Sequence, residues 1–114
     1  MGLILWIDQN TFAASLLEKV FKKKDLPFYT MNSAKDFSYL VIDLKPTMIV
    51  LDVETAQSSI VELRKQVAET PELKTMPFVT IGKSTEFDFL NVVGSIPRSF
   101  DPYKIPEILN HLRS

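Results

Sequence analysis

Cysteine is absent from this chain of 114 residues, and histidine occurs once, at His111. Without cysteine there is no disulfide, no thiolate nucleophile and no cysteine-ligated metal. Because His111 has no second ligand nearby in the sequence, we expect it to be a surface residue. The chain has only three glycines, and neither the GxGxxG motif nor a P-loop can be written from them. These absences argue against thiol chemistry and the common nucleotide-binding motifs.

Strong net charge and long apolar runs are also missing. The formal net charge is −1, so no long-range field attracts nucleic acid or anionic lipid, and neither is an expected partner. No apolar run approaches the roughly 20 residues of a membrane span. The opening letters MGLILWID lack the basic region of a signal peptide. These features, with the absence of cysteine, predict a cytoplasmic protein without a membrane partner.

Hydrophobic residues make up 46% of the chain and charged residues 24%, which is typical of a globular protein. The length predicts one domain, residues 1–114. Apolar runs of strand length alternate with segments of helical periodicity. The expected strands are 3–7, 28–31, 48–51 and 78–81, with a fifth before Pro97. The expected helices begin after a cap at Asn10 or Thr11, after Asn32 or Ser33, at about Ser58 and at about Ser84, and the last is capped by Asp101.

Strands that alternate with helices predict an open parallel sheet, because parallel neighbours need crossover connections. Strands 3–7 and 48–51 are apolar throughout, which is typical of central strands buried on both faces. The expected fold is therefore a doubly wound α/β sheet of five parallel strands in the order 2-1-3-4-5, a flavodoxin-like arrangement. In such sheets ligands bind at the carboxyl ends of the central strands.

Each of the two central strands is followed by an acid, Asp8 and Asp52. Either acid could simply cap the turn that follows its strand. Because the carboxyl ends of neighbouring parallel strands meet at one edge of the sheet, the two acids also form a candidate acidic pocket there. The sequence favours the pocket, since it accounts for both residues together.

Four segments carry a resemblance to a known family. They are LILWIDQN at the first strand, KPTMIVLDVE at the third, TPELKTMPFVTIG before the fourth and IPRSFDPYKIPEIL before the last helix. In this order and spacing the chain resembles, over nearly its whole length, the receiver domains of two-component response regulators. The resemblance implies a phospho-acceptor position at Asp52, a pocket formed with Asp8, Gln9 and the carbonyl of Glu54, and a protein partner in bacterial signalling.

Several positions depart from the family pattern. Where receivers have an acidic pair, the chain has Asp8 and the neutral Gln9, so Mg²⁺ held by Asp8 and Asp52 is expected to bind weakly at most, and none is required. The two switch positions are occupied by Gly82 and Ser95 in place of a hydroxyl residue and an aromatic residue. The family's lysine position is Arg98, which is followed by serine instead of proline, so a cis peptide is not expected there.

The segment between the fourth strand and Arg98 is shorter than in typical receivers, so we expect its helix, at 84–90, to be short or rebuilt. Phe87, Phe89, Phe100 and Tyr103 lie in or near this segment and form a candidate interface with a partner or a second copy, through the face of segment 84–90 and the last helix. Burial of one member of the pair Phe87 and Phe89, with exposure of the other, is the alternative. We expect Trp6 to be a core residue.

Three functions remain open at this stage. The favoured one is an atypical receiver, or pseudo-receiver, that acts as a protein-interaction module without phosphorylation-driven switching, with a standing ion pair between Arg98 and Asp52. The second is a functional receiver that is phosphorylated on Asp52 by a histidine kinase. The third is a small-molecule-binding or enzymatic flavodoxin-like domain, which the lack of any paired nucleophile and base disfavours. The expectation is therefore that the chain is not an enzyme.

Overall fold

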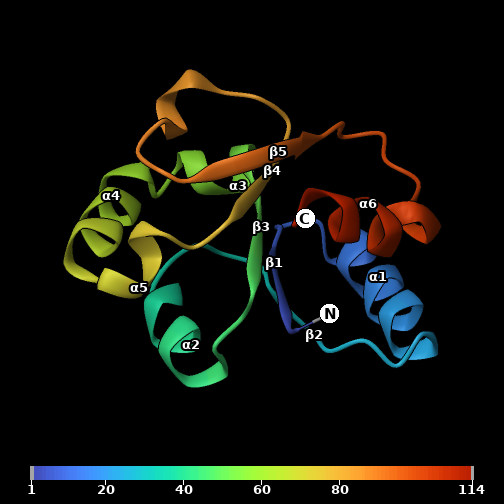
Figure 1. The fold of residues 1–114 in the computed structure, drawn as a ribbon. Coiled ribbons are helices and arrows are strands. Elements are labelled where there is room, and N and C mark those ends of the chain that lie inside the picture. The colour runs from blue at the N-terminus through green and yellow to red at the C-terminus, as the bar shows by residue number, and fades with distance from the viewer. Residues whose placement is uncertain (1, 114) are drawn as a thin grey trace.

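A five-stranded parallel sheet forms the centre of the computed structural model, which describes residues 2–113 (Figure 1). The strand order is β2-β1-β3-β4-β5, as predicted. The strands are β1 (Ile4–Ile7), β2 (Phe28–Met31), β3 (Met48–Asp52), β4 (Phe78–Ile81) and β5 (Val92–Ile96). The central strand β3 pairs with β1 from Ile4 opposite Met48 to Ile7 opposite Leu51. Asp8 and Asp52 therefore reach the same edge of the sheet.

Helices cover both faces of this sheet. On one face lie α1 (Thr11–Lys23) and α6 (Ile105–Leu112), and on the other lie α2 (Phe37–Leu44), α4 (Ile60–Glu69) and the short α5 (Pro71–Lys74) (Figure 1). Two further short elements, α3 (Val53–Gln57) and the 3-10 turn η1 (Thr85–Phe87), follow β3 and β4 at the edge that carries the acids. A second 3-10 turn, η2 (Pro102–Lys104), leads into α6.

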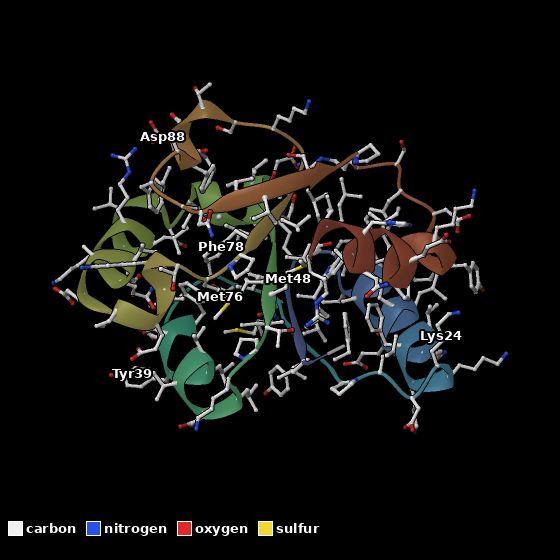
Figure 2. All side chains as sticks on the ribbon, viewed as in Figure 1. Lys24, Tyr39, Met48, Met76, Phe78 and Asp88 are labelled. Carbon is white, nitrogen blue, oxygen red and sulfur yellow. The ribbon has the colours of Figure 1, made fainter. Side chains whose placement is uncertain are left out.

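The alternation of side chains along the central strands divides the core into two clusters. Leu5, Ile49 and Phe78 pack toward the face covered by α2 and α4, whereas Trp6 and Val50 pack toward α1 and α6. Met48 and Phe78 are fully buried in the middle of the sheet, while Lys24, Tyr39 and Asp88 lie at the periphery (Figure 2). The prediction that Trp6 is a core residue is confirmed, since none of its surface is exposed.

Two features of the helices differ from the prediction because of local hydrogen bonds. The second helix begins at Phe37, since Ser33 Oγ accepts a hydrogen bond from Lys35 N at 3.1 Å and closes a turn instead of capping the helix. The third predicted helix, from about Ser58 to Glu69, is α4, and the short helix α3 before it was not predicted. The carboxylate of Asp52 caps α3 by accepting a hydrogen bond from Thr55 N at 3.3 Å.

The connection between β4 and β5 is rebuilt, as its short length predicted. The helix expected at 84–90 is reduced to the 3-10 turn η1, and β5 follows after four residues. Phe87 is buried under this turn, with 1% of its surface exposed, and its ring lies 6.1 Å from that of Phe89. Arg64 covers the Phe89 ring at 5.2 Å from the centroid.

Burial corrects the predicted aromatic interface. Phe87 is inaccessible because it packs into the core cluster on the face covered by α2 and α4, and Phe100 packs edge-on against Trp6 at 5.6 Å between ring centroids. Phe89 is only partly exposed, so of the four aromatic residues Tyr103 alone is strongly exposed, at 68%. No helix within residues 2–113 is long and apolar enough to cross a membrane.

Candidate functional site

The central feature of the acidic edge is an ion pair between Arg98 and Asp52. Arg98 follows β5, and its Nη1 donates to Asp52 Oδ1 at 2.7 Å. The Asp52 side chain is 2% exposed, whereas that of Arg98 is 45% exposed. The same Nη1 lies 3.4 Å from Oε2 of Glu54, whose side chain is largely exposed. Arg98 is therefore the cation that neutralises the buried carboxylate, and the predicted ion pair is present.

The second oxygen of Asp52 is occupied by Thr55. The Thr55 hydroxyl donates to Asp52 Oδ2 at 2.7 Å and accepts a hydrogen bond from Gln9 N at 2.9 Å. This buried hydroxyl thus joins the start of α3 to the loop after β1. Sequence reasoning missed Thr55, although its position three residues after Asp52 is the ordinary spacing of a helix cap.

Asp8 lies beside this pair and is 6% exposed. Its Oδ1 accepts a hydrogen bond from Asn10 N at 3.0 Å, and its Oδ2 accepts a longer one from Trp6 Nε1 at 3.4 Å. Burial raises the pKa of Asp8 above its ordinary value, and the charge of Asp52 adds to this effect, while the bond from Asn10 N opposes it. The neighbouring Gln9 has an exposed side chain and contributes its backbone N–H to the site.

The carboxylate oxygens of Asp52 and Asp8 do not fit a Mg²⁺ ion in the observed arrangement. Mg²⁺ needs free, hard oxygen ligands in near-octahedral geometry, but both oxygens of Asp52 are engaged by Arg98 and Thr55, and both oxygens of Asp8 accept hydrogen bonds. Across residues 2–113, no three acidic, histidine or cysteine side chains are grouped as a metal ion would require. An ion at Asp52 would have to share the carboxylate with the Arg98 guanidinium and the Thr55 hydroxyl.

Gly82 makes room for Arg98. Its φ of +84° lies in the left-handed region that favours glycine. A Cβ atom at this position would lie 3.1 Å from Arg98 Nη2 and 3.2 Å from a methyl group of Val53. Because Gly82, at the first predicted switch position, has no side chain, the Arg98 guanidinium can lie beside it.

The second switch position, Ser95, is held by a hydrogen bond. Ser95 lies on β5 opposite Thr80 of β4, and the two hydroxyl oxygens are 2.8 Å apart. Sequence reasoning did not find this contact, because it depends on the register of two strands separated by a rebuilt loop. The peptide bond after Arg98 is trans, as expected from the absence of proline at Ser99.

We predict that Arg98→Met lowers the free energy of unfolding by about 1–3 kcal/mol. Removal of one partner leaves the Asp52 carboxylate buried and uncompensated, and the effect is smaller than for a fully buried pair because Arg98 is half exposed. Chemical denaturation of Arg98→Met, Asp52→Asn and the double variant measures it. The double variant should be more stable than Arg98→Met, and the exposed Lys83→Met serves as the control. Equal stability of Arg98→Met and the parent chain would contradict the prediction.

The raised pKa of Asp8 predicts a pH-dependent effect of Asp8→Asn. The folded state holds the Asp8 proton more tightly than the unfolded state, so this carboxyl contributes stability at acidic pH that is lost as the pH rises through its folded pKa. Asp8→Asn should therefore be more stable than the parent at neutral pH, and the difference should shrink on acidification. Chemical denaturation from acidic to neutral pH measures the difference in the free energy of unfolding. Asp43→Asn, on the exposed side of α2, is the control. A difference that is independent of pH would refute the assignment.

Comparison with known proteins places the whole chain beside response regulators. No protein-family model and no curated protein matches the sequence. Among solved structures, the chemotaxis response regulator CheY4 of Vibrio cholerae superposes with a TM-score of 0.79 and 15% identity, over 98% of each chain. A response regulator signal receiver domain from Bermanella marisrubri gives 0.77 and 12%, over 100% of each chain. A response regulator from Desulfuromonas acetoxidans gives 0.79 and 12%, over 98% of this chain and 96% of that one. The chain therefore has the fold of response-regulator receiver domains, as the sequence motifs predicted.

Proposed function

We propose that the chain is a pseudo-receiver: a protein-interaction module of bacterial signal transduction that does not switch on phosphorylation. The observation that carries the proposal is the 2.7 Å contact between Arg98 Nη1 and Asp52 Oδ1. In receivers, which the sequence resembles, the acceptor aspartate must be free to attack a phosphoryl donor. Here one oxygen of Asp52 is held by a charged, short hydrogen bond from Arg98, and the other accepts a hydrogen bond from the Thr55 hydroxyl.

The electrostatics of the pocket support the same proposal. A phosphoryl group on Asp52 would bring a charge of about −1.5 to −2 next to Asp8 and Glu54. Arg98 is the cation in contact with Asp52 in this site, and its charge is already used to neutralise that carboxylate. Since Gln9 replaces one acid of the family's metal site, a divalent cation has few ligands with which to offset the added charge.

The means of transmitting a phosphorylation signal are also altered. A receiver couples its acceptor site to its surface through a hydroxyl residue after the fourth strand and an aromatic residue on the fifth. In this chain the first position is Gly82, which has no side chain, and the second is Ser95, bonded to Thr80. Neither residue provides the movement that the family pattern requires, so the proposed module has one conformation of this region.

The partner is proposed to be a protein. A second copy bound through the face of β5 and α6 is one form of this proposal, supported by the exposure of Val92 and Val93 at 40% each and of Tyr103 at 68%. The alternative function is a receiver that is phosphorylated on Asp52 by a histidine kinase. It is supported by the burial of Asp52 and by its position at the end of β3. The two functions differ in their response to Mg²⁺.

A titration with MgCl₂ followed by beryllium fluoride, a phosphoryl mimic, tests the proposal. Trp6 reports on the site because its indole N–H contacts Asp8 Oδ2. We expect no saturable change in Trp6 fluorescence up to millimolar Mg²⁺, and no response to the mimic. The double variant Gln9→Asp, Arg98→Met should gain Mg²⁺ binding, because it adds a carboxylate and frees Asp52.

Two outcomes would decide against the pseudo-receiver. The first is saturation of the parent chain at millimolar Mg²⁺ with a further change on addition of beryllium fluoride. The second is incorporation of a phosphoryl group from acetyl phosphate into the parent chain but not into Asp52→Asn. Either result would establish the functional receiver instead.

A further inference from the structure

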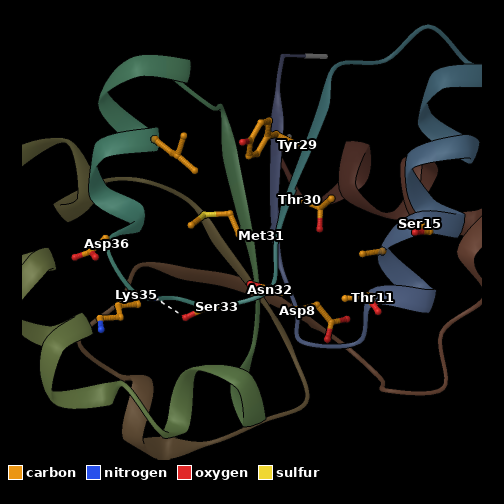
Figure 3. Close-up of a pocket in the computed structure, with 12 residues that line it drawn as sticks. Asp8, Thr11, Ser15, Tyr29, Thr30, Met31, Asn32, Ser33, Lys35 and Asp36 are labelled. Atoms are coloured by element: carbon orange, nitrogen blue, oxygen red, sulfur yellow. Dashed lines mark hydrogen bonds between the residues drawn. The ribbon is translucent and has the colours of Figure 1, made fainter.

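A groove runs along the outer edge of the sheet, beside β2 and between α1 and α2 (Figure 3). Among the described strands, β2 pairs with β1 alone and so forms one edge of the sheet. The groove encloses about 630 Å³ and is bounded at one end by the loop of residues 32–36. Its volume is within the range of clefts that bind ligands.

The backbone of β2 presents free hydrogen-bonding groups to this groove. Ile4 N and Asp8 N of the β1 segment donate to Pro27 O and Met31 O. Because backbone groups of a strand point alternately to its two sides, Phe28 and Thr30 direct their N–H and C=O groups outward. The strand, of sequence FYTM, contains no charge and no proline. Of the features that commonly prevent an edge strand from pairing, β2 has its short length of four residues but neither charge nor proline.

The two walls of the groove differ in character. Figure 3 shows Tyr29 and Met31 on the side of α2, where Leu40 also lines the groove, so this wall is apolar. Thr30 points to the other side, where α1 contributes small polar side chains, Thr11 and Ser15. An added strand would place alternate side chains on the two walls. The groove thus selects a segment with alternating apolar and small polar residues.

Charge adds a preference at one end. The lining near the carboxyl end of β2 contains the acids Asp8 and Asp36 and one base, Lys35. The excess negative charge favours a lysine or arginine in the bound segment at this end. A second copy of the chain fits less well, because its own β2 is flanked by helices that would meet α1 and α2 of the first copy.

We infer that this groove binds an extended segment of a partner protein as a sixth strand added to β2. The segment carries apolar residues toward α2, small polar residues toward α1 and a basic residue beside Asp36. The inference rests on the proposed role as a protein-interaction module. It uses the groove beside β2 and not the ion pair of Asp52 and Arg98, although Asp8 lines both sites. It specifies the residue types of the bound segment, which the site around Asp52 does not specify.

Two acetylated and amidated hexapeptides, which place the arginine on the same face as the valines, provide the test: Arg-Ser-Val-Ser-Val-Ser and its reverse, Ser-Val-Ser-Val-Ser-Arg. They cover antiparallel and parallel addition. With the full chain in solution, we expect one of them to give saturable amide shifts in β2 and slower hydrogen exchange at the Thr30 amide. Replacement of the peptide arginine by glutamate should weaken binding about two- to fivefold, the size of an exposed charge contact.

Matched variants separate backbone pairing from side-chain effects. Thr30→Pro removes the outward N–H and should abolish binding, since an edge strand tolerates proline where its N–H faces away from the sheet. Thr30→Val keeps the N–H and should bind as the parent does. Asp36→Asn should reduce the preference for arginine over glutamate, and asparagine suits the positive φ of 57° at this position.

Three results would overturn the inference: undiminished binding by a folded Thr30→Pro variant, peptide-induced shifts confined to the β5 edge, or no binding of either peptide at millimolar concentration. The measurements contain no Mg²⁺ and no phosphoryl mimic. If neither peptide binds, the result of the Mg²⁺ titration is therefore unaffected. If the titration contradicts the pseudo-receiver proposal, the peptide result is likewise unchanged.

Discussion

The organisation of the acidic edge depends on the contact between Arg98 and Asp52. A buried carboxylate is costly unless it is paired and hydrogen-bonded, and Asp52 meets both conditions, with Arg98 on one oxygen and Thr55 on the other. Through these two bonds the end of β3 is connected to the segment after β5 and, by way of Gln9 N, to the loop after β1. Three loops that are distant in sequence are held around one carboxylate by protein hydrogen bonds.

The short connection between β4 and β5 explains much of the remaining surface. With only a 3-10 turn in place of a helix, Phe87 is drawn into the core and Arg64 covers Phe89. The face that the sequence suggested as an aromatic interface is consequently reduced to the β5 edge and Tyr103. At the opposite edge of the sheet, β2 has no such covering loop, and α1 and α2 leave a groove beside it. The β5 edge and the β2 edge therefore present different surfaces to a partner.

The sequence predicted the fold because its signals are local and repeated. Apolar runs, caps such as Asn10 and the turn residues before α6 each specify one element, and their alternation restricts the topology to a parallel sheet. The ion pair was also predictable, since Asp52 and Arg98 follow strands whose carboxyl ends share an edge. The bond between Thr80 and Ser95 was not predicted, because it depends on the register of two strands, which residue patterns do not encode. Thr55 and the short helix α3 were missed although the spacing of three residues after Asp52 is that of a helix cap.

Gly82 limits which residues can occupy its position. A hydroxyl at this position would need a side chain where φ is +84° and where Arg98 Nη2 and Val53 leave little more than 3 Å for a Cβ atom. A serine or threonine at 82 therefore meets both backbone strain and a close contact with the Arg98 side chain. The two positions constrain each other, because a hydroxyl residue at 82 is tolerated best together with a change at 98 that moves the guanidinium.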